Sequence, residues 1–203
     1  MSVVAVIDFE TTGMSPDHGD RATEVAIVLV EGGRVIDRFQ SLMNAGVRIP
    51  AFITQLTGIS NAMVAAAPEA GEVMRRASRF VGDAPLVAHN ASFDRKFWVD
   101  ELARLGLPAP QPFACTMLLS RRLYPQAPNH KLGTLVDYHR LARAGAAHRA
   151  LADAEMAAGL LARILDDLHH HYGVASVDHA LLMALQRCQR GQIAATVSRH
   201  VGV

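Results

Sequence analysis

A continuous apolar run near the start of the chain ends in two acidic residues, and this feature constrains the fold more than any other. The run from Val3 to Ile7 is short, rich in β-branched residues and uninterrupted, which is typical of a strand buried on both faces of a sheet. Asp8 and Glu10 follow it, with Phe9 between them. Because residues i and i+2 of a strand point to the same side, the two carboxylates share one face. Buried charges are costly unless a partner neutralises them, so the pattern predicts a bound cation.

The order of the apolar segments indicates an α/β fold. Three consecutive strand patterns come first, and the turn Gly32-Gly33 between the second and the third indicates a hairpin. Strand and helix patterns then alternate, which favours a mixed sheet with helices on both faces. We therefore predict a central five-stranded sheet in which parallel strands join a three-stranded antiparallel meander. The predicted strands are 3–10, 24–30, 34–41, 85–90 and the start of 112–123, and the predicted helices are 61–81, 93–105, the rest of 112–123, 131–141 and 149–168.

The bulk properties suit one globular domain with an appended helix. The chain has 203 residues, half of them hydrophobic, which is enough apolar material for a sizeable core. Its formal net charge is +1, so no strong global field indicates a nucleic-acid-binding surface, although a small cleft with local charge stays compatible with this value. We predict a domain over residues 1–172 and a helical extension over 173–203. This extension either packs on the domain or mediates contact with a partner.

The two cysteines, Cys115 and Cys188, favour a reducing compartment. They lie far apart in the sequence and belong to no CxxC pattern, which argues against a disulfide and against a zinc site. The N-terminal apolar run is too short for a signal peptide, and no stretch has the length of a transmembrane helix. We therefore expect a cytoplasmic protein that makes no contact with a membrane.

Two further acids are candidates to complete a metal site. Asp94 follows the strand pattern 85–90 at the start of a helix, and Asp153 lies in the first turn of the long helix 149–168. Ligands of open α/β sheets bind at the carboxyl ends of the strands, where such side chains gather. Four carboxylates carry about −4 and two divalent ions carry +4, which is the balance of a two-metal site for phosphoryl chemistry. Oxygen ligands favour Mg²⁺ or Mn²⁺. Taken alone, Asp94 or Asp153 could equally be a helix N-terminal charge favoured by the dipole.

His148 is the candidate proton acceptor. It stands five residues before Asp153, and this offset lets its imidazole lie over the metal site from the loop side. A histidine whose pKa is near neutrality can take a proton from a water molecule. The competing interpretation is an ordinary surface or core histidine.

Three segments, "DFETTG", "HNASFD" and "HRALAD", resemble in this order the three motifs of the DEDDh family. These are the DnaQ-like 3′→5′ exonucleases, which include the proofreading epsilon subunit of bacterial DNA polymerase III. The segment "LTGIS" (56–60) is also similar to a substrate-contacting segment of that family. The resemblance covers about residues 3–168, and its strength lies in the joint match rather than in any single motif.

The resemblance implies a ribonuclease H-like fold and a 3′→5′ exonuclease. It implies two Mg²⁺ or Mn²⁺ ions held by Asp8, Glu10, Asp94 and Asp153, with His148 as general base. The substrate would be the 3′ end of single-stranded or frayed DNA, and the product a nucleoside 5′-monophosphate. A role in proofreading, with a DNA polymerase subunit as partner, would fit the epsilon-like first motif.

The resemblance also implies a set of substrate contacts. A glycine at position 13 would let the backbone approach a phosphate or a 3′-hydroxyl closely, and Leu56 would give a terminal base an apolar surface to stack on. The competing interpretation is core packing for Met14, anchoring of its helix for Phe93 and helix capping for Asn90. The expected substrate-binding residues are Thr11, Gly13, Met14, Leu56, Thr57, His89, Asn90 and Phe93.

One departure and two rival functions accompany the resemblance. Many relatives have an Asp-Thr pair where this chain has Cys115-Thr116, but that pair supplies no metal ligand. Within the enzymes, the rival is an RNA 3′-end-trimming exoribonuclease similar to RNase T or oligoribonuclease, because a contact to the 2′-hydroxyl depends on pocket geometry. Outside the enzymes, the rival is an inactive nuclease-fold accessory or scaffold subunit of a polymerase. The sequence does not decide the oligomeric state.

Overall fold

The computed structural model describes residues 2–143, 145 and 148–201, so a few positions of both predicted ranges, 1–172 and 173–203, lie outside the described residues. A five-stranded sheet in the order β3-β2-β1-β4-β5 forms the centre, as predicted. Its first three strands make the antiparallel meander, and β4 and β5 add to it in parallel. The strands are β1 (Val4–Thr11), β2 (Ala22–Glu31), β3 (Arg34–Leu42), β4 (Leu86–Ala88) and β5 (Phe113–Cys115).

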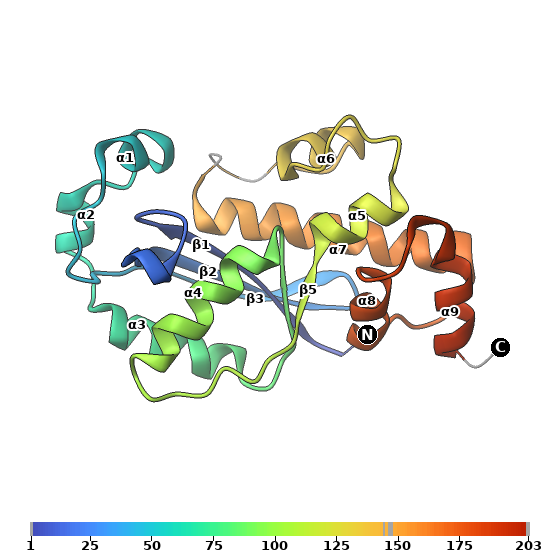
Figure 1. Ribbon diagram of the computed structural model, residues 1–203, viewed down its shortest axis with the longest axis horizontal. Helices are drawn as coiled ribbons and strands as arrows, with labels where there is room; N and C mark the ends of the chain where they lie inside the picture. Colours follow the sequence, from blue (N-terminus) through green and yellow to red (C-terminus); the bar gives the residue numbers. More distant parts are fainter. Residues whose placement is uncertain (1, 144, 146–147, 202–203) are drawn as a thin grey trace.

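Helices cover both faces of this sheet (Figure 1), and the period-two alternation of β1 divides the core between them. Val4 and Val6 join the core under the long helix α7 (Ala150–Tyr172). Ala5, Ile7 and Phe9 join the core on the opposite face, under α3 (Ala70–Val81) and α4 (Ala91–Ala103). Asp8 and Glu10 continue the row of Val4 and Val6 and therefore lie on the α7 face.

The predicted helix 61–81 is wrong as a single element. The structure has α2 (Asn61–Ala65) and α3, with Pro68 between them. Proline lacks a backbone N–H and disfavours the helical conformation of the residue before it, so the chain turns here. A short helix, α1 (Ala51–Thr57), and a 3₁₀ turn, η1 (Pro16–His18), also precede α2 and were not predicted.

The remaining helices follow the predicted pattern with shifted ends. Strand β5 runs into a helix as expected, and α7 continues beyond residue 168 until Gly173, whose φ of 66° ends it. None of the described helices has the length and apolarity to cross a membrane. The two helices between β5 and α7 are α5 (Thr116–Leu123) and α6 (Leu132–Tyr138).

The segment after α7 forms two helices instead of the single predicted one. They are α8 (His179–Leu185) and α9 (Ile193–Val201), separated by η2 (Arg190–Gln192). Leu181 and Leu185 of α8 belong to the same buried cluster as α7 and the sheet. The side chain of Gln186 accepts a hydrogen bond from the Cys115 N–H of β5 at 2.7 Å and donates one to the Phe113 carbonyl at 3.4 Å. A domain boundary at residue 172 stays a prediction, because this packing is continuous with the core.

Candidate active site

The four predicted acids come from three elements that meet at the carboxyl end of β1. Asp8 and Glu10 lie on β1, Asp94 in the first turn of α4 and Asp153 in the first turn of α7. Carboxylate oxygens of Glu10 and Asp153 and a ring nitrogen of His148 lie within 4.8 Å of one another. Asp94 Oδ1 accepts a hydrogen bond from the Phe9 N–H at 3.1 Å, which ties α4 to β1 between the two strand acids. The structure therefore brings together all the acids that the sequence singled out.

This arrangement raises the pKa of every one of these carboxyl groups. For Asp8 the largest cause of the raised pKa is burial, followed by the charges of Asp94 and Asp153. Burial and the charge of Asp153 raise the pKa of Glu10 to about 7, although Arg149 partly opposes them. Burial likewise raises the pKa values of Asp94 and Asp153. Burial and mutual repulsion both disfavour the charged form of these carboxyl groups. A divalent cation bound among them would neutralise the charge and favour that form.

The donor set fits hard divalent cations. Carboxylate oxygens are the ligands that Mg²⁺ and Mn²⁺ prefer, and they dominate this cluster. The imidazole of His148 stands at its solvent side, where the residue is exposed.

His148 has an unusual backbone that is held by one of the acids. Its φ is 59°, in the left-handed region that non-glycine residues rarely adopt, and its N–H donates to Asp153 Oδ2 at 3.2 Å. Strained residues of this kind cluster at functional sites. The hydrogen bond connects the position of the histidine to the first turn of α7.

Sequence reasoning missed Glu24, which braces the same helix start. Glu24 is fully buried, and its carboxylate binds Arg149 Nε at 3.1 Å and Nη2 at 2.9 Å. It also accepts hydrogen bonds from Gln40 Nε2 at 2.7 Å and from the Ala150 N–H at 3.2 Å. Burial alone would raise the pKa of Glu24, but these hydrogen bonds outweigh burial and lower it. The available signal was a charge at the head of the apolar segment "EVAIVLV", which was predicted as the strand start although β2 begins two residues earlier.

A second missed acid explains the glycine at position 13. A Cβ on Gly13 would lie 2.3 Å from Asp20 Oδ1, so any other residue here would force this carboxylate to move. Asp20 also accepts hydrogen bonds from the Ser15 N–H at 3.1 Å and from Thr12 Oγ1 at 3.4 Å. Thr11 Oγ1 donates to the Gly13 carbonyl at 2.6 Å. The turn after β1 is thus braced internally, and its glycine has a structural reason that needs no substrate.

Met14 and Leu56 differ from the other predicted substrate contacts in their exposure. Met14 is 73% exposed and Leu56 is 53% exposed, which rules out the core interpretation of Met14. Thr57 is buried, and its hydroxyl donates to the Ile53 carbonyl within α1. Phe52, one turn before Leu56, is 66% exposed and was not predicted.

The three predicted substrate contacts at and just before the start of α4 differ in how the protein holds them. His89 is held by Thr116 Oγ1 at 2.9 Å and by the His130 carbonyl at 3.0 Å, and burial lowers the pKa of its ring to about 4. Asn90 has a φ of 70°, and its side chain makes no capping hydrogen bond to α4. Phe93 packs against Phe97 with ring centroids 5.0 Å apart.

Comparisons with known proteins agree on one family. The family model described as "Exonuclease" matches residues 5–161. The DNA polymerase III subunit epsilon of Aquifex aeolicus is 32% identical over 189 residues, covering 92% of this chain and 90% of that protein. The 3′-5′ exonuclease DinG of Bacillus subtilis is 39% identical over 164 residues, covering 80% of this chain and 18% of that protein.

Other relatives are much longer. A PolC-type DNA polymerase III from Caldanaerobacter subterraneus is 35% identical over 182 residues, covering 90% of this chain but only 13% of its own length. The chain thus spans about an eighth of that relative. Among solved structures, exonuclease X in complex with 5′-overhanging duplex DNA has a TM-score of 0.66 at 30% identity, covering 80% of this chain and 91% of that one.

Proposed function

The chain belongs to the exonuclease family, with its ribonuclease H-like fold, and on that premise we propose that it is a 3′→5′ exonuclease acting on single-stranded or frayed DNA. Its products are nucleoside 5′-monophosphates. The observation that carries this proposal is the gathering of Asp8, Glu10, Asp94 and Asp153 at one sheet edge, where burial and mutual repulsion raise their pKa values. A scaffold protein has no use for such a costly cluster, whereas a two-metal phosphodiester hydrolase uses acids of this kind to hold its ions.

The four acids hold two Mg²⁺ or Mn²⁺ ions in this proposal. Divalent ions supply charge stabilisation for a phosphodiester that is being cleaved. Glu10 and Asp153 are the best supported ligands, because their oxygens already converge. Asp94 remains tied to the Phe9 N–H and holds α4 in place against β1.

His148 is the general base. Its ring takes a proton from the attacking water, and its backbone bond to Asp153 fixes the loop from which it works. The position is exposed, so the imidazole reaches solvent while staying near Glu10.

The substrate strand runs past the exposed apolar residues Met14 and Leu56, which offer stacking surface without reading the base. Thr11, Gly13 and Thr57 fix the backbone on which these side chains stand, and His89, Asn90 and Phe93 contact the strand from the segment that leads into α4. DNA is favoured over RNA, because two relatives at 30% identity or more that this chain covers over about nine-tenths of their length are named for DNA polymerase III and for a DNA complex. By the same similarity, a DNA polymerase subunit is the proposed partner.

One experiment tests the proposal as a whole. The protein is incubated with Mg²⁺ or Mn²⁺ and with 5′-labelled single-stranded DNA, single-stranded RNA or a mismatched primer–template. A ladder that shortens stepwise from the 3′ end of DNA supports the proposal, and faster shortening of RNA replaces it with RNA trimming. Asp8→Asn is the matched control, since it removes one charge at nearly constant volume. Persistent activity in Asp8→Asn, or none in the wild type with either metal, contradicts the proposal.

A further inference from the structure

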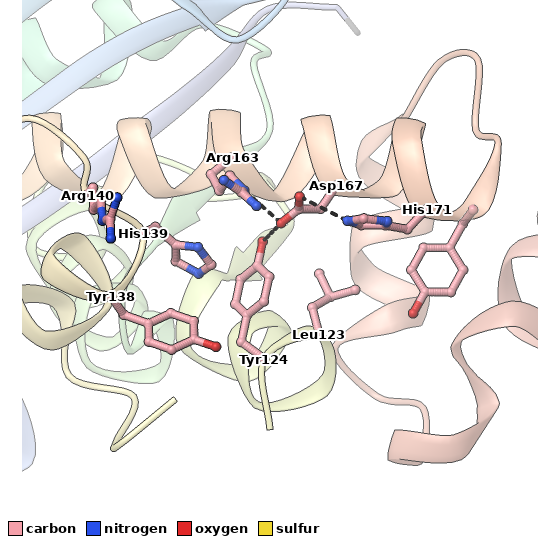
Figure 2. A pocket seen from close by; sticks show the side chains of 9 residues that line it. Leu123, Tyr124, Tyr138, His139, Arg140, Arg163, Asp167 and His171 are labelled. Atoms are coloured by element: carbon pink, nitrogen blue, oxygen red, sulfur yellow. Dashed lines mark hydrogen bonds and ion pairs between the residues drawn. The ribbon is translucent and has the colours of Figure 1, made fainter. Parts of the chain in front are cut away.

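A cavity of about 580 Å³ lies between α5, α6 and α7 (Figure 2). Arg163 and Asp167 of α7 line it. Arg163 lies ten residues after Asp153 on this helix. At a rise of 1.5 Å per residue, the cavity is therefore about 15 Å along α7 from the acid cluster. Ligand sites in proteins span about 300–1,000 Å³, so this volume suits a small molecule or a single nucleotide.

The cavity wall carries the positive charge of Arg163, and Asp167, the only acid among the described residues of the lining, is already hydrogen-bonded. Asp167 accepts hydrogen bonds from Tyr124 Oη at 2.7 Å and from Arg163 Nε at 2.9 Å, and His171 Nε2 lies 3.6 Å away. The terminal nitrogens of Arg163 remain available to a ligand, because its hydrogen bond to Asp167 uses Nε alone. This network holds one guanidinium rigidly at the cavity wall.

Arg140 adds a second guanidinium at the same cavity. Its nearest acid in sequence, Asp137, is taken by Arg143 through hydrogen bonds of 3.0 and 2.7 Å. Arg140 itself has a φ of 54°, a left-handed backbone that turns the chain just after α6. Among the ion pairs of the described residues, none involves Arg140. Two guanidiniums with one engaged carboxylate leave a net positive wall, which suits a phosphate.

Aromatic rings make up much of the remaining lining. The His139 ring lies edge-on to Tyr124 and Tyr138, with centroids 4.2 and 4.9 Å away, and Tyr138 is 44% exposed. His139 Nε2 is buried and has no hydrogen-bond partner, which is unusual for a buried polar atom. A ligand with a flat ring would give the exposed face of Tyr138 a stacking partner beside the His139 ring.

We propose that this cavity binds a nucleotide, with its phosphate on Arg140 and Arg163 and its base against Tyr138 and His139. The ligand is either a free nucleoside monophosphate or one unit of a strand. The site goes beyond the proposed exonuclease reaction, since none of its residues belongs to the acid cluster.

The tyrosines provide a selective probe for this site. The chain has three tyrosines, and all of them, Tyr124, Tyr138 and Tyr172, line this cavity. Protein labelled with 3-fluorotyrosine is titrated in EDTA with thymidine 5′-monophosphate, inorganic phosphate or a short thymidine oligonucleotide, and ¹⁹F NMR is recorded. Because no metal or turnover is needed, failure here is distinguishable from failure of the exonuclease proposal.

We expect the thymidine monophosphate or the oligonucleotide to shift the fluorotyrosine signals, and the one that shifts them identifies the source. Arg140→Ala should weaken binding by about tenfold, the size of one lost charged hydrogen bond. Arg79→Ala, which removes an exposed arginine from α3 on the opposite face of the sheet, should bind as the wild type does. Three results would overturn the proposal: no shift at millimolar ligand, equal affinity for inorganic phosphate, or unchanged affinity in Arg140→Ala.

Discussion

Glu10 and Glu24 face each other across the β1–β2 ladder, yet the protein treats them in opposite ways. Glu24 is bound by Arg149, Gln40 and the Ala150 N–H, and these hydrogen bonds lower its pKa in spite of burial. Glu10 has other carboxylates around it, and burial together with the charge of Asp153 raises its pKa to about 7. The two residues are of the same type and are paired on adjacent strands, so the difference lies in their partners. The carboxylate that the fold satisfies stabilises the structure, and the one it leaves unsatisfied is available for chemistry.

The largest expected effect is on activity, and it separates the two glutamates. Glu10→Gln should lower the rate of nucleotide release by on the order of 10³-fold or more, because a lost metal ligand removes several kcal/mol of charge stabilisation. Glu24→Gln should keep most of the activity per folded molecule. The measurement is single-turnover digestion of labelled single-stranded DNA with Mg²⁺. Similar losses of activity in both variants would contradict the assignment of different roles to Glu10 and Glu24.

His148→Ala should lower kcat by about 10²–10³-fold, within the usual range for a general base. Metal binding should change little, because the carboxylates supply the expected ligands. The pH–rate profile should also lose the limb that reports deprotonation of the base. A variant with the rate and the pH profile of the wild type would show that His148 is a bystander.

Metal should stabilise the protein through Glu10 and not through Glu24. At a hundredfold excess over Kd, a ligand that binds only the folded state adds about 2.7 kcal/mol to the free energy of unfolding. Thermal unfolding with and without Mg²⁺ should show this gain in the wild type and in Glu24→Gln, and much less of it in Glu10→Gln. An equal metal response in all three proteins would place the ion elsewhere.

Glu24→Gln should cost about 2 kcal/mol of folding stability, because it leaves the Arg149 guanidinium without its buried counter-charge. Glu10→Gln should not destabilise the metal-free protein, since it removes repulsion. Glu155→Gln is the matched control on α7: its partner Arg38 is 51% exposed, and surface pairs contribute about 0–1 kcal/mol. Urea denaturation of the four proteins measures these differences, and a Glu24→Gln midpoint equal to the wild-type value would refute the bracing role.

The smallest expected effect is a change in acid sensitivity. The folded-state pKa of Glu24 is lowered from its ordinary value of 4.5, so its contribution is complete above that value and disappears as the pH falls through the lowered pKa. Glu24→Gln should therefore lose less stability than the wild type over that acid range. Unfolding free energies measured at a series of acid pH values test this, and parallel curves would contradict it.

The sequence predicted the parts of the fold and site that local patterns encode. Asp8 and Glu10 were identified as candidate metal ligands because they are two charges at the end of an apolar strand. The antiparallel meander was predicted because glycines mark its hairpin. The prediction of one helix over 61–81 was wrong because the helical spacing of its apolar residues was given more weight than Pro68. The prediction also passed over the charge of Glu24 inside its strand.

Other features depend on residues that are distant in sequence. The fit of Gly13 against Asp20 exists only after the turn has closed, and the partnership of Glu24 with Arg149 spans 125 positions. The cavity of Tyr124, His139 and Arg163 likewise forms only when α5, α6 and α7 pack. No local pattern reports such contacts, which is why these residues became visible only in the structure.

The side chain of Gln186 has a consequence for solubility. Strand β5 is the last strand of the sheet, so its outer backbone groups are a template for pairing with a strand of another molecule. The Gln186 amide occupies the Cys115 N–H and the Phe113 carbonyl, much as a peptide group of a sixth strand would. The other border, β3, carries exposed charges instead, among them Arg34, Asp37 and Arg38. By occupying these two groups, Gln186 at the end of α8 should disfavour edge-to-edge pairing with another molecule.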